Sequence, residues 1–418
     1  MTTGPGEHTA AVAAVLSRLG AEDRSRLLAV LAHRFHDLDL AEDVLSDAMV
    51  AAMERWPEAG TPDNPAAWLL TVAKNRALDI VRGDAVRARR LATLRIEDEL
   101  VAGEARDHSE ELVESFGSAR IPDERLNLFF TCSHPTLKTS EQVALILRCL
   151  GGLSTAEVAA GFLVDTTTMQ QRLVRAKKRI RVTGIPFRRP ADDELPERLP
   201  PVLRVLYLIY TQGYVATAGP AHVRPELTTE AIRLTRVLAH LLPAETEVRG
   251  LLALFLLTEA RQATRSDAEG LPVPLSRQER SRWDSSLIVE GLSLVTRAAG
   301  EPGSGGYTIQ AAIAALHAEA ASFADTDWKQ IRVLYAMLHR LEPTPMVALA
   351  EAVAISRSEG PRAGLRALEE VGLEGRRPFH IARSIMLREV GDEAAGAAEA
   401  ERARRCPGND AESAFIDL

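Results

Sequence analysis

Hydrophobic positions along most of this chain recur every three or four residues, which is the period of a helix and not of a strand. Met169, Leu173 and Ala176, for example, fall at i, i+4 and i+7 and define one buried stripe. Runs of β-branched residues bounded by turn residues are scarce. The pattern therefore predicts an all-α protein.

Breaks in this pattern divide the chain into blocks. The stretch 91–120 is acidic and contains Gly103 and Gly117, and "GIPFRRPADDELPERLPP" at 184–201 is rich in proline and charge. We expect a helical block at 9–90, an acidic linker at 91–120, a second compact helical block at 121–189, a helical extension domain at 190–325 with breaks near 262–280 and 298–307, and helical hairpins at 326–418.

The last block is weakly repetitive. Gly360 and Gly391 lie 31 residues apart, and in both places an apolar helix stops at a glycine before an Ala-rich helix. This spacing is near the 34-residue period of tetratricopeptide repeats. Ala-rich helical hairpins give the same pattern without being repeats, so both readings stay open.

Composition places the chain among soluble globular proteins of several domains, since its 418 residues are 46% hydrophobic and 26% charged. Cys132, Cys149 and Cys406 are far apart in sequence, which argues against a disulfide framework and for a reducing compartment. No apolar run reaches the roughly 18 residues of a spanning helix, and the N-terminus lacks the basic start of a signal peptide. We expect a cytoplasmic protein.

Charge is distributed unevenly. The net charge is −8, yet the segment 172–189 holds eight basic residues and no acidic one, while 97–124 holds ten acidic residues and two basic ones. Binding of a polyanion depends on local clustering and not on the sum, so this segment is a candidate nucleic-acid surface.

The stretch "LSTAEVAAGFLVDTTTMQQRLVRAKKRIR" at 153–181 predicts a helix-turn-helix. Ser154 and Glu157 fit a capping box that begins the first helix, and Thr166 or Thr167 is expected to cap the second. The outer face of the second helix offers polar side chains to base edges and cations to phosphate. A solvated amphipathic helix pair with incidental charge is the alternative.

A second candidate surface lies in "TPDNPAAWLLTVAKNRALDIVR" at 61–82, with Asn64 as N-cap and Pro65 at the first helical position. Trp68, Thr71, Asn75 and Arg82 share one stripe, which Lys74 and Arg76 flank. A flat ring, an amide and cations suit unpaired bases. The alternative is that Trp68 is simply a core residue. The preceding helix at 41–56 has an acidic face with Asp43, Asp47 and Glu54, which would repel DNA and suits a basic protein.

These segments together resemble a bacterial extracytoplasmic-function sigma factor. "DLAEDVLSDAMVAAMERW" resembles regions 2.1–2.2 of that family, "NPAAWLLTVAKNRALDIVR" regions 2.3–2.4, and "LILRCLGGLSTAEVAAGFLVDTTTMQQRLVRAKKRIR" region 4, in that order over residues 10–185. Further stretches such as "VLRVLYLIYTQGY" and "RWDSSLIVEGL" are similar to the subgroup with a long C-terminal extension, in which a helical domain precedes tetratricopeptide-like repeats.

The resemblance implies a role for each block: 9–90 as region 2, 121–189 as region 4, and the acidic linker running through the polymerase channel. It implies that the chain binds the β′ and β subunits of core RNA polymerase, with Glu42, Asp43 and Asp47 contacting β′. The residues implied to capture the melted minus-ten element are Trp68, Thr71, Lys74, Asn75, Arg76 and Arg82. Those implied for the minus-thirty-five element are Thr167, Thr168, Gln170, Gln171 and Arg172, with Arg175 and Lys178 on phosphate.

The sequence departs from the family in places. Ser46 stands where many relatives have Gln, Asp47 where many have Glu, and "YTQGY" at 210–214 lacks the acidic residue typical of the subgroup. The first two departures affect the detail of the polymerase contact but not its charge.

No enzyme active site, cofactor or metal site is expected. Cys132 and His134 have no second ligand pair at suitable spacing, and no phosphate-binding or catalytic motif is present. We expect a regulatory role for the C-terminal extension, with a regulatory protein as partner. The alternatives are a ligand-responsive helix-turn-helix regulator with an α-helical effector domain, and a tetratricopeptide adaptor with incidental charge.

Overall fold

The computed structural model describes residues 12, 14–16, 19–94, 124–162, 164–214, 224–268 and 271–406. Within these ranges the secondary structure is helical apart from one isolated bridge between Ser266 and Pro272, which confirms the all-α prediction. The predicted linker at 91–120 lies outside the described residues except for 91–94, which are helical. The chain forms two compact units: unit 1 comprises 1–160 and 164–205, and unit 2 comprises 161–163 and 206–418.

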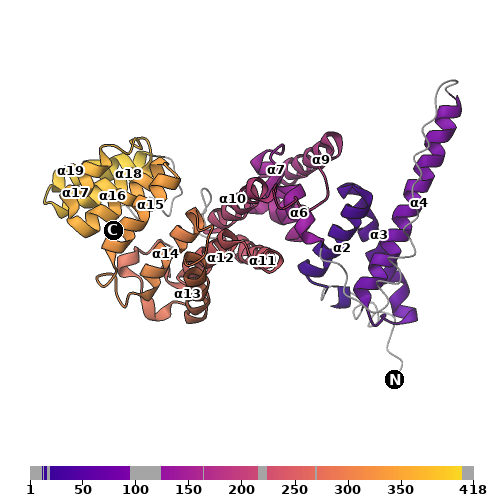
Figure 1. Ribbon diagram of the computed structural model, residues 1–418, viewed down its shortest axis with the longest axis horizontal. Helices are drawn as coiled ribbons and strands as arrows, with labels where there is room; N and C mark the ends of the chain where they lie inside the picture. The colour runs from indigo at the N-terminus through magenta and orange to yellow at the C-terminus, as the bar shows by residue number, and fades with distance from the viewer. Residues whose placement is uncertain are drawn as a thin grey trace. The chain divides into compact units, whose positions relative to one another are not determined.

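The first part of unit 1 is a three-helix bundle of α2 (Ala21–Phe35), α3 (Leu38–Ala59) and α4 (Pro65–Leu94) (Figure 1). The turn between α2 and α3 follows from its residues, since His36 adopts a left-handed φ of 53° and the Asp37 carboxylate accepts hydrogen bonds from the Asp39 and Leu40 amides at 2.8 and 3.1 Å. The side of α3 that faces the core buries Leu45, Ala48, Ala52 and Trp56, and Met49 on the same side is half-buried.

The second part of unit 1 contains α6 (Arg125–Cys132), α7 (Thr139–Leu145), the π-helical turn η1 (Ile146–Leu150), α8 (Thr155–Gly161) and α9 (Thr166–Thr183). The predicted stripe Met169, Leu173 and Ala176 is buried, and Ile180 continues it by another turn. Gly184 ends α9 with a left-handed φ of 64°. The helix-turn-helix expected at 153–181 is therefore present as α8 and α9.

A helix, α10 (Leu195–Tyr214), begins inside the Pro-rich stretch that was interpreted as a boundary. Pro200 and Pro201 lie within it, and the division between the two units falls after Val205, in the middle of this helix. Each proline removes a backbone donor and disfavours a helix. Burial of the neighbouring Leu199, Val202 and Val205 offsets that cost.

Unit 2 continues with α11 (Pro225–Leu241), α12 (Thr246–Glu259), α13 (Ser285–Ala299) and α14 (Gly306–Glu319). The predicted breaks are confirmed. Short 3-10 turns η2 (Gln262–Thr264), η3 (Leu275–Arg277) and η4 (Arg280–Arg282) fill the first, and the loop between α13 and α14 forms the second.

The C-terminal helices form antiparallel hairpins (Figure 1). They are α15 (Trp328–Leu341), α16 (Pro345–Glu359), α17 (Pro361–Leu368), α18 (Arg377–Glu389) and α19 (Glu393–Arg405). Gly360 and Gly391 sit at the predicted helix ends with φ of 97° and 88°, a conformation that disfavours other residues. The repeated hairpin pattern is confirmed, while its relation to tetratricopeptide repeats stays a prediction.

One close approach fixes how α12 packs on α14. The Glu247 carboxylate accepts hydrogen bonds from the Gly305, Tyr307 and Thr308 amides at 2.9 to 3.0 Å, so it neutralises the exposed donors at the start of α14. Three residues along α12, a Cβ on Gly250 would come within 2.8 Å of the Thr308 backbone nitrogen. Only glycine at position 250 permits this separation.

We expect Gly250→Ala to destabilise unit 2 by about 1–3 kcal/mol, because the added methyl group forces α12 and α14 apart. Thermal unfolding followed by circular dichroism measures the effect as a lowered Tm. Gly375→Ala is the matched control, since a Cβ there would meet nothing within 4 Å. Equal Tm values for the two variants would contradict this account of the packing.

Candidate nucleic-acid interface

The start of the helix-turn-helix is capped at both helices, although not entirely as predicted. The capping box of α8 is confirmed, with Ser154 and Glu157 bonding reciprocally at 2.7 and 3.2 Å. The cap of α9 is Asp165 and neither Thr166 nor Thr167. Asp165 accepts from both the amide and the hydroxyl of Thr168, at 2.6 and 2.7 Å, because its carboxylate carries two acceptors where a threonine has one hydroxyl.

The predicted base-reading face of α9 is open to solvent for most of its members. Thr167, Gln170, Gln171, Arg175 and Lys178 are exposed. Thr168 and Arg172 are half-buried, and the Thr168 hydroxyl already donates to Asp165. These residues occupy one side of the helix, opposite the buried stripe, as a DNA-reading helix requires.

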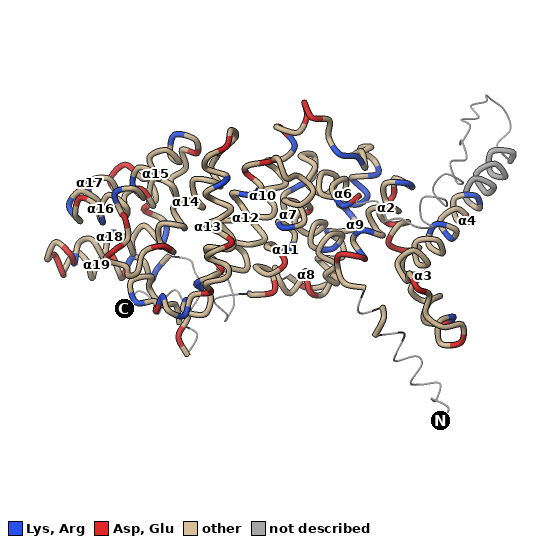
Figure 2. The backbone as a smooth tube through the Cα atoms, turned by 60° about the horizontal axis from the view of Figure 1, so that its bottom comes forward, with Lys and Arg blue, Asp and Glu red and all other residues tan. Residues whose placement is uncertain are grey.

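Most of the basic residues at 172–189 are paired with carboxylates that lie outside this run. The five that form ion pairs are Lys177 with Asp39 and Glu42, Arg179 with Glu141, Arg181 with Asp37, Arg188 with Glu194, and Arg189 with Asp192. The run itself contains no acidic residue, but the fold brings carboxylates to Lys177, Arg179 and Arg181, and acidic residues just after the run pair with Arg188 and Arg189. Within the described residues, no ion pair engages Arg172, Arg175 or Lys178, the three cations of α9 predicted to touch DNA. Figure 2 shows the basic positions along α9.

The second candidate surface lies on α4. Thr71, Asn75, Arg76 and Arg82 are exposed, and Trp68 and Lys74 are half-buried. The Trp68 ring meets Trp56 edge to face, with centroids 5.2 Å apart. Trp68 is thus partly a core residue, as the alternative held, but it is not enclosed.

The predicted polymerase-binding residues of α3 divide into an exposed pair, Asp43 and Asp47, and the largely covered Glu42. Asp43 is exposed, and partial burial together with the neighbouring Asp39 carboxylate raises its pKa. Asp47 is exposed and forms an ion pair of 3.2 Å with Arg76, so a predicted polymerase residue touches a predicted minus-ten residue.

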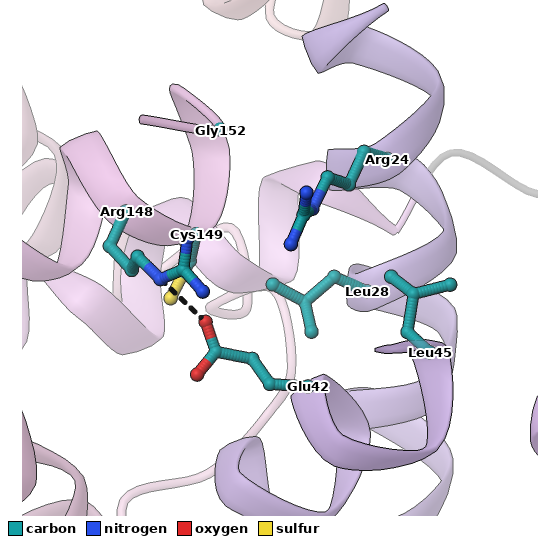
Figure 3. Close-up of a pocket in the computed structure, with 7 residues that line it drawn as sticks. All are labelled: Arg24, Leu28, Glu42, Leu45, Arg148, Cys149 and Gly152. Carbon is teal, nitrogen blue, oxygen red and sulfur yellow. Dashed lines mark ion pairs between the residues drawn. The ribbon is translucent and has the colours of Figure 1, made fainter. Parts of the chain in front are cut away.

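Glu42 is the largely covered residue of the three. Its carboxylate lies between two cations of the second part of unit 1, with Arg148 Nε at 3.0 Å from one oxygen and Lys177 paired to the other. Its side chain is only 17% exposed. Figure 3 shows Glu42 directed at Arg148, with Leu28 and Leu45 beside it and Arg24 across the gap. Burial and the nearby Arg148 lower the pKa of Arg24.

Lys177 is largely buried and pairs with two carboxylates, those of Glu42 and Asp39. Burial is the largest single influence on its pKa and lowers it, but the charge and hydrogen bond of Glu42, together with Cys149 and Asp39, raise the pKa above its usual range. A second carboxylate, that of Asp39, accepts from Lys177 Nζ at 3.0 Å. Lys177 is therefore charged, and its charge is directed into unit 1 and not outward.

Sequence reasoning did not find Arg148, Lys177 and Asp39 as a group. They come from three helices, and ion pairs that span more than 100 residues leave no periodic signal. The signal that existed was Glu42, an acidic residue one turn from the buried Leu38 and Leu45.

No cluster of three or more His, Cys, Asp or Glu side chains suited to a metal ion occurs among the described residues. Cys132 and Cys149 are both buried and both free thiols. The pKa of the Cys132 thiol is well above its usual range, mainly because of a hydrogen bond with Cys149 and secondly because the thiol is buried. Among the described helices, none combines the length and apolar character that a bilayer crossing requires.

Comparison with known families finds three matching families along the chain. Residues 21–87 match Sigma-70 region 2, residues 131–180 match Sigma-70 region 4, and residues 198–299 match a family of unknown function, DUF6596. The chain is 40% identical over 397 residues to a protein of Rhizobium meliloti (strain 1021) named "Uncharacterized protein R00370", covering 94% of this chain and 92% of that protein. No solved structure matches the chain.

Two sigma regions in this order define a protein that brings RNA polymerase to promoters. The chain belongs to the sigma-70 family, as an extracytoplasmic-function type of sigma factor with a C-terminal helical extension. It binds core RNA polymerase, recognises promoter DNA and initiates transcription.

We expect Arg175→Ala to weaken binding of the polymerase complex to promoter DNA and to lower the slope of log K against log salt concentration by about one, because one phosphate contact is lost. Filter binding at several salt concentrations measures the slope. Arg297→Ala removes an exposed helical cation from unit 2 and is the matched control. An unchanged slope for Arg175→Ala would exclude this residue from the phosphate contact.

Proposed function

We propose that this sigma factor holds its promoter with two separate heads and that the residues named above carry the contacts. The exposed face of α9 reads the minus-thirty-five element as duplex, with Thr167, Thr168, Gln170, Gln171 and Arg172 towards base edges and Arg175 and Lys178 on phosphate. The observation that carries this proposal is which cations of α9 form ion pairs within the chain and which do not. The cations of α9 predicted for DNA are the ones without ion pairs among the described residues, while the other five cations of the run at 172–189 are paired with carboxylates.

The exposed stripe of α4 takes the minus-ten element as opened strand. Thr71 and Asn75 offer hydrogen-bonding groups to base edges, and Arg76, Arg82 and Lys74 offer charge to the backbone. Trp68 presents part of a ring on which a base can stack. The exposure of this stripe, next to the anchored Trp56–Trp68 pair, supports the assignment.

Core polymerase binds the acidic face of α3, with Asp43, Asp47 and Glu42 towards a basic surface of the β′ subunit and further contacts to β. The chain itself catalyses nothing in this scheme and needs no cofactor, and it works where bacterial polymerase works, in the cytoplasm. Capturing unstacked bases costs a few kcal/mol for each base step. The chain alone does not supply that energy, and the polymerase complex has to provide most of it.

We expect the free chain to give little specific shift of its promoter fragment in a gel and the complex with core polymerase to give a clear one. Run-off transcription with core polymerase, on the DNA upstream of the protein's own gene, tests the same point. Tight, specific binding by the free chain as a dimer on a palindromic site would contradict the proposal and favour a ligand-responsive helix-turn-helix regulator. That alternative uses one DNA-binding block and leaves the α4 stripe without a role.

The C-terminal extension regulates this activity by binding a protein partner. A groove of about 460 Å³ between the hairpins supports this role. Its lining mixes apolar side chains such as Ala348 and Ile355 with polar ones, including His339, which forms an ion pair with Glu351 at 2.7 Å. Grooves between helical hairpins suit short protein segments.

We expect Ala348→Arg, which fills this groove with a charged side chain, to change the run-off yield at least threefold in crude extract but not with purified polymerase alone. Truncation within α10 is a poor test, because that helix belongs to both units. Ala299→Arg, at an exposed helix end of the same unit, is the control. Equal yields for the two variants in extract would exclude the groove as a partner site.

A further inference from the structure

Three arginines of unit 2 alternate with two aromatic rings in the segment that matches DUF6596. The guanidinium carbon of Arg265 lies 3.3 Å from the centre of the Tyr214 ring, and Arg261 Nη2 donates to the Tyr214 hydroxyl at 2.7 Å. The guanidinium of Arg261 also lies 5.9 Å from the centre of the Trp283 ring, and that of Arg280 lies 4.9 Å from the same ring. We call Arg261, Arg265 and Arg280 the arginine cluster, and Arg261 is its central member.

No carboxylate neutralises the arginine cluster. Within the described residues, none of its three members forms an ion pair. Two acidic residues are close enough to act on it electrostatically, but both are engaged by hydroxyl groups. Glu259 accepts from Tyr210 and Thr228 at 3.1 and 3.0 Å, and Asp325 accepts from Ser322 at 2.6 Å. The positive charge of the cluster is therefore left without a direct counterion.

Two members of the cluster have a structural role that explains their positions. Arg280 Nη1 donates to the carbonyl of His317 and, at 2.6 Å, to that of Ala320, which are the last carbonyls of α14. Arg265 Nη1 donates at 2.8 Å to the carbonyl of Tyr214, where α10 ends. Cations are favourable at helix C-termini. These two guanidinium groups are therefore held in place by the fold before any ligand arrives.

Arg261 has no such role. Within the described residues its side chain makes one hydrogen bond, the one to the Tyr214 hydroxyl. Arg261 is half-buried, and none of its nitrogen atoms is among the buried side-chain atoms that lack a partner, so its other N–H groups face solvent. A guanidinium has five N–H donors in a planar fork that matches the oxygens of a phosphoryl group. Arg261 therefore has donors available at the centre of the cluster.

The ionisation of neighbouring groups reflects the same positive field. Burial first, and then the charges of Arg261 and Arg280, lower the pKa of His317 to about 4. Burial is also the main reason that the pKa values of Arg265 and Arg280 lie below their usual range, and the charge of Arg261 lowers both further. Burying like charges together is costly, and contacts with aromatic rings offset only part of that cost. A bound anion would offset the remainder.

We propose that the arginine cluster binds a small ligand through a phosphoryl group, with Arg261 in contact with its oxygens and Arg265 and Arg280 supplying the surrounding positive charge. Trp283 is buried, so no nucleobase can stack on it, and the phosphoryl group is the part of the ligand that is recognised. A nucleic-acid backbone would instead need a groove of cations that follows it. This inference goes beyond the proposed function, because it adds a ligand to unit 2 and does not depend on how the promoter is held.

The test titrates the full-length chain with inorganic pyrophosphate, which presents phosphoryl oxygens and no other recognition group. Isothermal titration calorimetry at constant ionic strength measures the Kd, so that general screening of charge stays the same throughout. We expect saturable binding to the unaltered protein. Arg261→Gln should weaken it about tenfold or more, because charge-assisted hydrogen bonds are lost. Arg261→Lys keeps the charge but not the planar fork and should give an intermediate Kd.

Two control variants show where the pyrophosphate binds. Arg297→Gln makes the same change at an exposed helical position of unit 2 and should leave the Kd unchanged. Arg175→Gln changes an exposed cation of α9, and it should weaken DNA binding without altering the Kd for pyrophosphate. Loss of pyrophosphate binding in Arg175→Gln but not in Arg261→Gln would place the anion on the promoter-binding helix and overturn the proposal.

Two further results would also overturn it. If Arg261→Gln lowers the Tm but binds pyrophosphate as tightly as the unaltered protein well below that temperature, Arg261 is only structural. If Arg261→Gln weakens binding of a single-stranded oligonucleotide while the Kd for pyrophosphate is unchanged, the cluster contacts nucleic acid and not a small ligand. Circular dichroism of each variant confirms that the helices are retained at the temperature of the titration.

Discussion

The arrangement of unit 1 depends on one half-buried carboxylate, that of Glu42, and on the cations that neutralise it. Glu42 accepts from Arg148 and Lys177, while Arg24 lies across a gap of about 10 Å³, so three cations surround Glu42 and its neighbour Asp39. Taking such charges out of water is costly unless each has a partner. Removing Glu42 would leave the cations facing one another, whereas separating the two regions returns every charge to solvent. The same contact is therefore stable when intact and reversible as a whole.

The sequence predicted what depends on local spacing. The helical class, the stripe Met169–Leu173–Ala176, the capping box of Ser154 and the glycine helix ends at 360 and 391 all follow from residues close together in the chain. The cap of α9 was misplaced by one residue or two, because Asp165 and the threonines after it are all good caps and only the backbone decides among them. The boundary expected at 184–201 became the start of α10, since buried leucine and valine side chains outweighed the prolines.

The sequence located the candidate surfaces, but it did not show which of their charged side chains are exposed and which are paired within the fold. Composition showed eight cations and no acid at 172–189. Only the structure shows that carboxylates from α3 and its N-cap, from α7 and from the segment after α9 pair with five of them. Local sequence therefore locates charge, while tertiary contacts decide which charges remain available. The same reasoning separates Asp43 and Asp47, which are exposed, from Glu42, which is not.

The ion pair between Arg76 and Asp47 has a consequence for the order of events at a promoter. In the free chain the two side chains pair with each other, with Arg76 Nε 3.2 Å from Asp47 Oδ2, and both are more than half exposed. If a cation of another protein pairs with Asp47, the guanidinium of Arg76 is released. If a phosphate pairs with Arg76, the carboxylate of Asp47 is released. Linkage requires the two effects to be equal, and an exposed pair of this kind is worth at most about 1 kcal/mol, or roughly fivefold in affinity. Opened DNA and the transcribing enzyme would then each favour the arrival of the other through a single side-chain contact.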